Sequence, residues 1–146
     1  MKVLVIHGPN LDALGTRAPE IYGTQTLDQI NAYIEEVAAD LGMSVEIHQT
    51  AREAEIISLL TDGAGIFDGA VLNPAALSHT SHAIADAIKG APYPVVEVHL
   101  TNIHGREQWR RRSVTAESAV GLVAGFKADS YALALDALRR LTADGP

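Results

Sequence analysis

The sequence lacks cysteine, has few positive charges and contains no long apolar run, and each shortage excludes a class of protein. Without cysteine, disulfide frameworks and thiolate metal sites are impossible. A formal net charge of −7 argues against nonspecific binding to nucleic acid. No apolar run reaches the roughly 18 residues of a membrane span, and the apolar start at residues 3–6 is too short for a secretion signal. We therefore expect a soluble cytoplasmic protein that binds neither nucleic acid nor membranes.

The length and composition indicate one folded domain. A chain of 146 residues lies within the usual size of a compact domain and is long enough to bury a real core. Its 47% hydrophobic and 20% charged residues are ordinary for a globular protein and far from the composition of disordered segments. The sequence contains no internal repeat, linker or low-complexity tract, so we expect a single domain over residues 1–146.

Short apolar runs alternate with helical patterns along the chain. Buried strands are expected at residues 3–6, 45–49, 69–73, 95–100 and 120–124. Helices are expected at residues 27–41, 53–60, from Ser78 or His79 to Lys89, and at 130–141, with a short helical turn at 106–110. The first helix begins at a capping box of Thr26 with Gln29 and ends before Gly42, and a loop at residues 8–24 precedes it. Five strands alternating with helices favour an α/β fold with a doubly wound, five-stranded parallel sheet of the flavodoxin type.

Polar residues follow three of the expected strands. Asn10 comes after the first, Asn73 ends the third, and His99 and Thr101 close the fourth. Ligands bind an open α/β sheet in the crevice outside the carboxyl ends of its strands, so these side chains point to one place. Taken singly, each asparagine is more often a turn former and the histidine is usually satisfied by a neighbour. Glu97 lies two positions before His99 on the same face, and such a pair suits either a structural role or a general acid.

Other patterns in the sequence carry weaker signals. The arginines at positions 106 and 110–112 would ordinarily form a solvated face, but in an acidic protein they are a candidate anion site. Residues 8–10 form neither a G-x-G-x-x-G nor a P-loop pattern, so nucleotide binding has little support. The histidines lack partners at metal-ligand spacing, and Ser81 and Ser113 lack the strand-turn-helix context of a nucleophile. We therefore expect no metal and no cofactor.

Three motifs occur in order along nearly the whole chain. The first is His7-Gly8-Pro9-Asn10-Leu11 with Leu14-Gly15, Arg17, Pro19 and Tyr22-Gly23; the second is Asn73-Pro74 with His79-Thr80-Ser81 and Asp86; the third is residues 97–104 with Arg106-Glu107 and Arg110. Their residues and separations resemble the signatures of the type II 3-dehydroquinate dehydratases.

The resemblance implies conversion of 3-dehydroquinate to 3-dehydroshikimate by anti elimination through an enolate, without metal or Schiff base. It implies that Tyr22 removes the proton alpha to the ketone. Because a tyrosine with an ordinary pKa near 10 is a poor base at neutral pH, Arg17 is expected to stabilise the tyrosinate. Asn10 is expected to hold the water that stabilises the enolate oxygen. His99, positioned by Glu97, is expected to protonate the departing hydroxyl.

The resemblance also assigns substrate-binding residues, namely Asn73, His79, Asp86, Leu100, Thr101 and Arg110. Asn73, Thr101 and the backbone N–H groups of Leu100 and Thr101 are expected to bind the substrate carboxylate. His79 and Arg110 are expected to hold the ring hydroxyls. Asp86 is expected to reach a neighbouring subunit's site within a homo-oligomer, a dodecamer assembled from trimers. The loop that carries the tyrosine is expected to act as a lid that excludes water.

Several positions depart from the pattern of this family, namely Ala51, Ala75, Leu77 and Ala85. Ala75 replaces a glycine, which matters only if the backbone there needs a positive φ. Ala85 stands beside Asp86 where an arginine is common, which puts an ion pair between subunits in doubt. Two alternatives stay open: the same chemistry on an amino analogue of dehydroquinate, and a non-catalytic module that binds a small carboxylate. The pair of Arg17 and Tyr22 favours an enzyme, because a binding module needs no base.

Overall fold

A five-stranded, all-parallel sheet forms the centre of the computed structural model, which describes residues 1–143. The strands are β1 (Lys2–His7), β2 (Ser44–Gln49), β3 (Gly69–Asn73), β4 (Val95–His99) and β5 (Gly121–Ala124). Their order in the sheet is β2-β1-β3-β4-β5. This is the flavodoxin-type order, so the predicted fold class is confirmed. Residues 144–146 of the expected domain lie outside the described residues.

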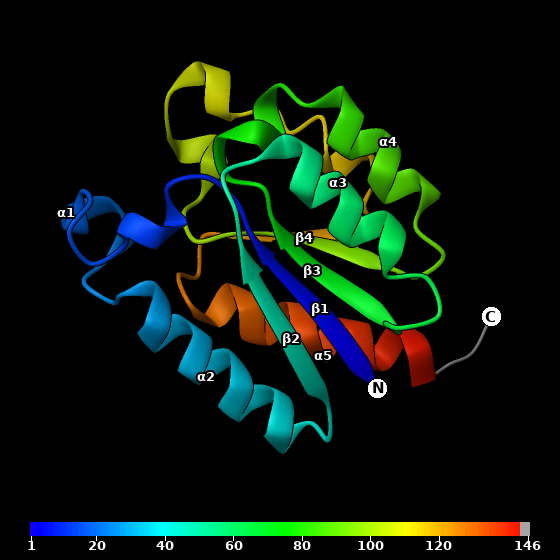
Figure 1. Cartoon of the computed structure of the whole chain (residues 1–146). Helices are drawn as coiled ribbons and strands as arrows, with labels where there is room; N and C mark the ends of the chain where they lie inside the picture. The colour runs from blue at the N-terminus through cyan, green and yellow to red at the C-terminus, as the bar shows by residue number, and fades with distance from the viewer. Residues whose placement is uncertain (144–146) are drawn as a thin grey trace.

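Two pairs of helices cover the two faces of the sheet (Figure 1). One face carries α2 (Leu27–Asp40) and α5 (Asp129–Ala143), and the other carries α3 (Glu53–Asp62) and α4 (His82–Gly90). None of the helices within residues 1–143 combines the length and hydrophobicity needed to cross a bilayer.

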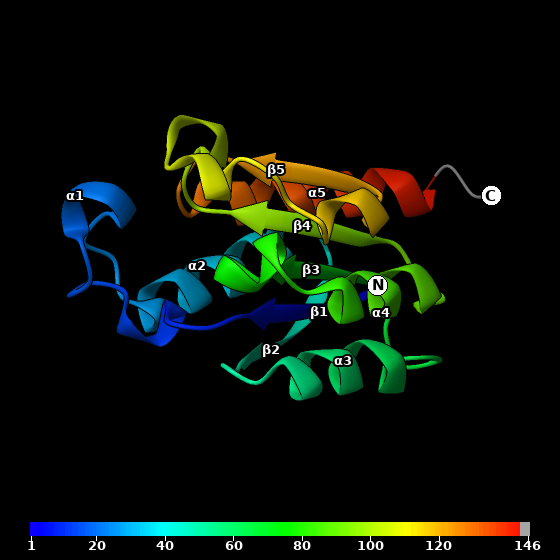
Figure 2. The same ribbon diagram turned by 90° about the horizontal axis from the view of Figure 1, so that it is seen from above.

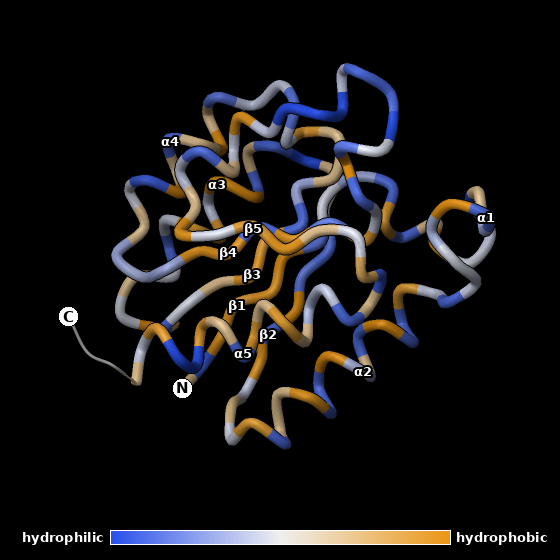
Figure 3. Tube along the Cα trace, turned by 180° about the vertical axis from the view of Figure 1, so that it is seen from behind, coloured by the Kyte–Doolittle hydropathy of each residue, from blue (hydrophilic) through white to orange (hydrophobic). Residues whose placement is uncertain are grey.

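The apolar strands supply both halves of the core. In β1, Val3 and Val5 pack with α2 and α5, whereas Leu4 and Ile6 pack with α3 and α4, and all four side chains are fully buried. Successive side chains of a strand point to opposite faces, so burial on both faces requires the continuous apolar run seen in the sequence. Figure 3 shows this run as hydrophobic colour along the central strands.

The predicted boundaries of α2 are confirmed by its caps. The hydroxyl of Thr26 accepts a hydrogen bond from the backbone N–H of Gln29 at 3.2 Å, and the Gln29 side chain accepts one from the N–H of Thr26 at 2.9 Å. Gly42 has a φ of +72°, the left-handed conformation expected directly after a helix.

The predicted start of the third helix is wrong. Residues Ala75–His79 form a separate 3-10 turn, η2, and α4 begins only at His82. The hydroxyl of Ser81 caps α4 by accepting a hydrogen bond from the N–H of Ile84 at 3.0 Å. Ser78 is buried instead, and its hydroxyl donates to the carbonyl of Ala75 at 2.8 Å.

Two other segments also differ from the expected secondary structure. The expected loop at residues 8–24 contains a 3-10 turn, η1 (Leu11–Ala13), and a short helix, α1 (Pro19–Tyr22). The turn expected at 106–110 is a single 3-10 turn, η4 (Gln108–Arg110), which follows η3 (Ile103–Gly105) and precedes η5 (Ala116–Ser118). Proline at the first position of α1 suits a helix start, because its fixed φ is already helical.

The carboxyl ends of the strands and their loops lie at one end of the molecule (Figures 1 and 2). In both views α1 and the segment after β4 flank this end, whereas Met1 lies at the opposite end. Within the sheet, His7 at the end of β1 is level with Gln49 of β2 and Asn73 of β3. The topology therefore gathers the polar residues that follow the strands.

Candidate active site

A pocket opens at the carboxyl ends of β1, β3 and β4, between α1 and the segment after β4. It encloses about 480 Å³ of atom-free space, part of it open to solvent. Its lining includes most of the residues predicted from the sequence, namely Asn10, Arg17, Tyr22, Asn73, His79, His99, Leu100, Thr101 and Arg110. Arg106 and Ala75 line the same pocket.

Two guanidinium groups lie beside the tyrosine of this pocket. Tyr22 ends α1 and is half-buried, and the Cζ atoms of Arg17 and Arg106 each lie 5.1 Å from the centre of its ring. Arg106 also donates a hydrogen bond from Nη1 to the Tyr22 hydroxyl, at 3.0 Å, and a longer one of 3.4 Å to the hydroxyl of Thr101. A guanidinium that donates to a phenol oxygen is suited to stabilise negative charge on that oxygen. The expected neighbour, Arg17, thus contacts the ring, and the direct contact to the hydroxyl comes from Arg106.

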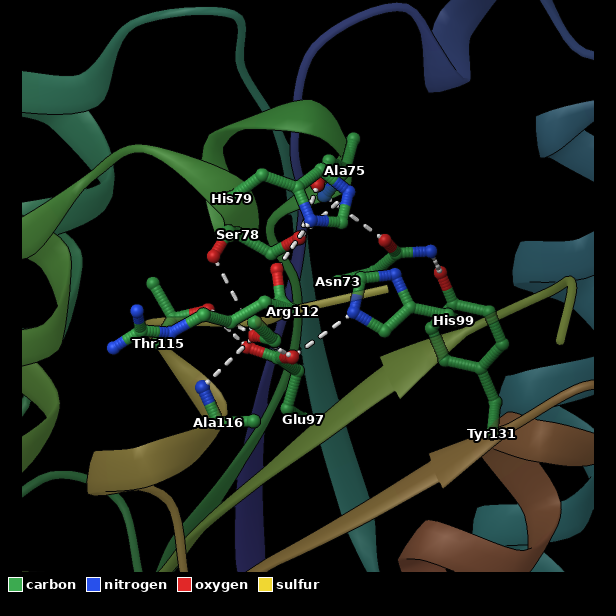
Figure 4. Close-up of polar contacts among 11 residues, drawn as sticks. Asn73, Ala75, Ser78, His79, Glu97, His99, Arg112, Thr115, Ala116 and Tyr131 are labelled. Carbon is green, nitrogen blue, oxygen red and sulfur yellow. Dashed lines mark hydrogen bonds and ion pairs between the residues drawn. The ribbon is translucent and has the colours of Figure 1, made fainter. Parts of the chain in front are cut away.

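The histidine at the end of β4 is paired with a buried carboxylate, as predicted. Glu97 is fully buried, and its Oε2 accepts a hydrogen bond from Nε2 of His99 at 2.9 Å. Because Nε2 faces the carboxylate, Nδ1 of the same ring is the nitrogen that points away from Glu97 (Figure 4). A histidine oriented in this way can deliver a proton from Nδ1 to a ligand in the pocket.

Two hydroxyl groups complete the surroundings of Glu97. Ser113 donates to Oε2 at 2.6 Å. Thr115, labelled beside Glu97 in Figure 4, donates to Oε1. The hydroxyl of Ser113 in turn accepts a hydrogen bond from the N–H of Ala116 at 3.0 Å. A carboxylate removed from water is tolerated when its oxygens accept several hydrogen bonds. Sequence reasoning considered Ser113 only as a nucleophile and gave Thr115 no role, because no local pattern relates either residue to Glu97.

Asn73 lies at the floor of the pocket, 2% exposed. Its Oδ1 accepts a hydrogen bond from the N–H of Ala75 at 3.1 Å, and its Nδ2 donates to the hydroxyl of Tyr131 at 3.0 Å. Ala75 has a φ of +52°, so the backbone here does need the conformation that favours glycine. An L-residue in this left-handed region is strained by about 1 to 2 kcal/mol.

His79 faces the pocket from the end of η2. Its Nδ1 lies 2.8 Å from the carbonyl of Arg112, which can only accept, so Nδ1 carries the hydrogen. Burial, together with the positive charges of His99 and Arg110, lowers the pKa of His79, although the bond to the Arg112 carbonyl opposes this. Nε2 of His79 lies 3.3 Å from the hydroxyl of Ser78, which already donates to the carbonyl of Ala75, so in a neutral His79 this nitrogen is unprotonated and able to accept a hydrogen bond.

Arg110 is held on the rim of the pocket by two neighbours. Its guanidinium stacks 3.9 Å from the centre of the Trp109 ring, and its Nε donates to Glu107 at 2.6 Å. The Trp109 ring also meets the edge of His79, with 5.3 Å between ring centres. These contacts hold a positive charge beside the pocket in an otherwise acidic protein.

The other predicted residues are placed as follows. Asn10, with a φ of +67°, is the third residue after β1, and Leu100 and Thr101 are the first two residues after β4. Asp86 is exposed on α4 and does not line this pocket, so a single chain does not bring it to the site. Within residues 1–143 no group of three or more His, Asp or Glu side chains is arranged to hold a metal ion.

The arrangement can move protons at two points of one small ligand. A tyrosine oxygen beside two cations is suited to accept a proton. A histidine fixed by a carboxylate is suited to donate one. Arg110, the N–H groups after β4 and the Asn73 amide are suited to bind an anionic, hydroxylated molecule.

Comparisons with known proteins identify the family. Residues 1–139 match the family model described as dehydroquinase class II. The chain is 54% identical to the 3-dehydroquinate dehydratase of Geotalea daltonii over 138 residues. These residues cover 94% of this chain and 96% of that protein. The type II dehydroquinase of Propionibacterium acnes superposes with a TM-score of 0.91 at 41% identity, covering 95% of this chain and 96% of that one. The type II dehydroquinase of Butyrivibrio crossotus gives a TM-score of 0.92 at 36% identity, covering 94% and 97%. The chain therefore belongs to the class II dehydroquinase family.

Proposed function

We propose that the protein is a hydro-lyase that converts 3-dehydroquinate into 3-dehydroshikimate in the shikimate pathway. The observation that carries the proposal is that one pocket contains a tyrosine hydroxyl bonded to a guanidinium, Tyr22 with Arg106, and a histidine bonded to a buried carboxylate, His99 with Glu97. Removal of water from a β-hydroxyketone needs one group to take a proton and another to give one, and these two pairs supply both functions.

In this proposal Tyr22 is the base. Its oxygen takes the proton alpha to the ketone, and the electrons of the broken C–H bond move into the enolate. Arg106 and Arg17 stabilise the tyrosinate, Arg106 by a direct hydrogen bond and Arg17 through the ring face. Asn10 holds a water molecule against the developing enolate oxygen, where negative charge appears in the transition state.

His99 is the acid in the second half of the reaction. Its Nδ1 gives a proton to the departing hydroxyl, which leaves as water while the enolate collapses to the conjugated enone. Glu97 fixes the ring through Nε2, and Ser113 and Thr115 hold the carboxylate in place. Tyr22 then loses its proton to solvent and His99 regains one from solvent, so that the enzyme ends the cycle unchanged.

The remaining pocket residues bind the substrate. Asn73 and the N–H groups of Leu100 and Thr101 bind the carboxylate, and Arg110 and the neutral His79 hold the ring hydroxyls. The segment that carries Arg17 and Tyr22 acts as a lid. Closed over the substrate, it excludes water and strengthens each of these interactions.

We further propose that residues 1–146 form one catalytic domain and that it works in the cytoplasm as a homo-oligomer, a dodecamer assembled from trimers. The exposed position of Asp86 on α4 supports this assembly, because the side chain is available to a neighbouring subunit's site. Sedimentation of the purified protein measures the assembly, and a monomer in solution would contradict it.

The activity is tested by ultraviolet absorbance of the conjugated enone when the protein is mixed with 3-dehydroquinate. We expect product from the native chain and none from Tyr22→Phe, which keeps the ring but loses the oxygen. Tyr33→Phe is the matched control, because the hydroxyl of Tyr33 donates to Asp129 and does not line the pocket. Absence of product from the native chain, or turnover of an amino analogue alone, would overturn the assignment of substrate.

A further inference from the structure

A chain of hydrogen bonds, part-buried at Asn31 and buried from His7 onward, runs from α2 through Tyr131 of α5 to β3. Asn31 of α2 lies with its Oδ1 2.8 Å from Nε2 of His7, and Nδ1 of His7 lies 2.8 Å from the hydroxyl of Tyr131. The Tyr131 oxygen lies 3.0 Å from Nδ2 of Asn73. His7 and Tyr131 are 0% and 1% exposed, and neither lines the pocket. The proposed reaction uses Asn73 alone among these residues.

The direction of every bond in this chain follows from one backbone group. The N–H of Ala75 can only donate, so the atom of Asn73 that faces it must be the amide oxygen. The amide nitrogen of Asn73 therefore faces Tyr131 and donates to its oxygen. A buried hydroxyl that accepts this bond is left to donate its own hydrogen to Nδ1 of His7.

This arrangement fixes the protonation of the histidine. Nδ1 of His7 accepts, so its hydrogen is on Nε2, where it is donated to Oδ1 of Asn31. A second hydrogen on Nδ1 would leave the hydroxyl hydrogen of Tyr131 without an acceptor in the core, which is costly. Burial acts in the same direction, because it lowers the pKa of His7 to about 4.

The opposite tautomer of His7 would reverse the chain. With its hydrogen on Nδ1, the ring would donate to Tyr131, and the tyrosine would donate in turn to Asn73. Asn73 would then have to turn its oxygen toward Tyr131 and its amide nitrogen toward the N–H of Ala75, so that two donors would face each other. The tautomer of His7 and the orientation of the Asn73 amide are therefore coupled through Tyr131.

We propose that His7 and Tyr131 are positioning residues that hold the Asn73 amide in one orientation, with its second Nδ2 hydrogen available to the substrate carboxylate. The proposal rests on the proposed function of the pocket and adds the reason why Asn73 presents a donor there. An amide that is already held in one orientation loses less conformational entropy when it binds an anion than an amide that can adopt both orientations. Neither positioning residue touches the substrate, so their substitution acts through Asn73.

The first experiment measures the tautomer of His7 by nitrogen-15 NMR of the native protein. We expect a neutral ring with its hydrogen on Nε2 at pH 7. A hydrogen on Nδ1, or a doubly protonated ring, would overturn the proposed direction of the chain. This measurement needs no substituted protein and no substrate, so it is independent of the proposed reaction.

The second experiment compares steady-state kinetics of Tyr131→Phe and Tyr93→Phe. Tyr93 is the matched control, because its buried hydroxyl donates to the carbonyl of Leu60 at 2.7 Å and does not line the pocket. We expect KM for 3-dehydroquinate to rise about tenfold in Tyr131→Phe, with a much smaller change in kcat, because a group that binds the carboxylate throughout the reaction is weakened. KM should stay at the native value in Tyr93→Phe.

Stability and KM together distinguish a positioning hydroxyl from a merely structural one. A merely structural hydroxyl would lower the unfolding temperature of both variants and leave both KM values unchanged, and this result would overturn the proposal. Absence of turnover in the native protein contradicts the proposed function itself. Native turnover with an unchanged KM in a folded Tyr131→Phe contradicts the positioning role alone.

Discussion

The guanidinium of Arg106 donates a hydrogen bond of 3.0 Å to the hydroxyl of Tyr22, although the two residues are 84 positions apart in the chain. The tyrosine comes from α1 and the arginine from the segment after β4, so the contact joins the proposed lid to the sheet end. With a side chain only 14% exposed, Arg106 meets the hydroxyl where solvent screens its charge weakly.

This contact predicts that Arg106→Met loses activity. Without the guanidinium, the tyrosine oxygen loses its direct cationic donor, and we expect kcat to fall by roughly 100-fold. Arg111→Met is the control, because Arg111 is an exposed arginine of the same segment that does not line the pocket. Enone formation measures both variants, and equal rates for the two would contradict the role of Arg106.

The hydroxyl of Thr115 is predicted to matter for both stability and rate. Thr115→Val keeps the shape but removes a donor to the fully buried Glu97, so we expect the free energy of unfolding to fall by about 2 kcal/mol. Because Glu97 holds His99, kcat should fall by about tenfold as well. Denaturant titration and kinetics measure the two effects. Thr80→Val, at an exposed position, should change neither the free energy of unfolding nor kcat. A native kcat in Thr115→Val would show that this hydroxyl does not contribute to the function of His99 as the acid.

Ala75 offers a site where glycine should stabilise the protein. Its φ of +52° strains an alanine and suits a glycine, so Ala75→Gly is expected to raise the free energy of unfolding by about 1 kcal/mol. The neighbouring Ala76 is not among the residues with positive φ, so Ala76→Gly should instead lower it by about 0.5 kcal/mol. Thermal unfolding compares the pair, and a loss of stability in both would mean that Ala75 is unstrained.

The buried His7 predicts a loss of stability in mild acid. Burial lowers its pKa from 6.5 to about 4, although the bond to Asn31 opposes this. Between these pH values the unfolded chain binds a proton here that the folded chain does not. The stabilisation is thus complete above pH 6.5 and disappears as the pH falls toward 4, a change of about 3 kcal/mol.

Denaturant unfolding between pH 7 and pH 4.5 tests this dependence. We expect His7→Gln to unfold more easily at pH 7 but with a flatter dependence on pH than the native chain. His82→Gln changes an exposed histidine of α4 and should keep the native dependence. A native slope in His7→Gln would show that other groups cause the acid sensitivity.

The fold was predictable because its signals are local. The continuous apolar runs of β1 and β3 require burial on both faces, and the capping box at Thr26 with Gln29 fixes the start of α2. The start of α4 was misjudged because a hydroxyl can cap a helix or bond inward. Ser78 bonds inward and Ser81 caps, and that choice depends on the tertiary structure.

The site was predictable where motifs carried it and unpredictable where distant segments meet. The pairing of Glu97 with His99 follows from alternation along one strand. The contacts of Ser113 with Glu97 and of Arg106 with Tyr22 join residues 16 and 84 positions apart, and no spacing rule relates them. The sequence placed His7 within a motif and Tyr131 within the last expected helix, and neither position indicated a role at the site.

The bond between His7 and Tyr131 joins residues 124 positions apart, so it can form only after nearly the whole chain has been synthesised. A growing chain releases its N-terminal residues first, so β1 leaves the ribosome long before α5 exists. Until α5 docks, Nδ1 of His7 and the amide of Asn73 have no tyrosine to bond, and burying them would be unfavourable. We therefore expect the floor of the pocket to be among the last parts of the molecule to form, after α5 has docked.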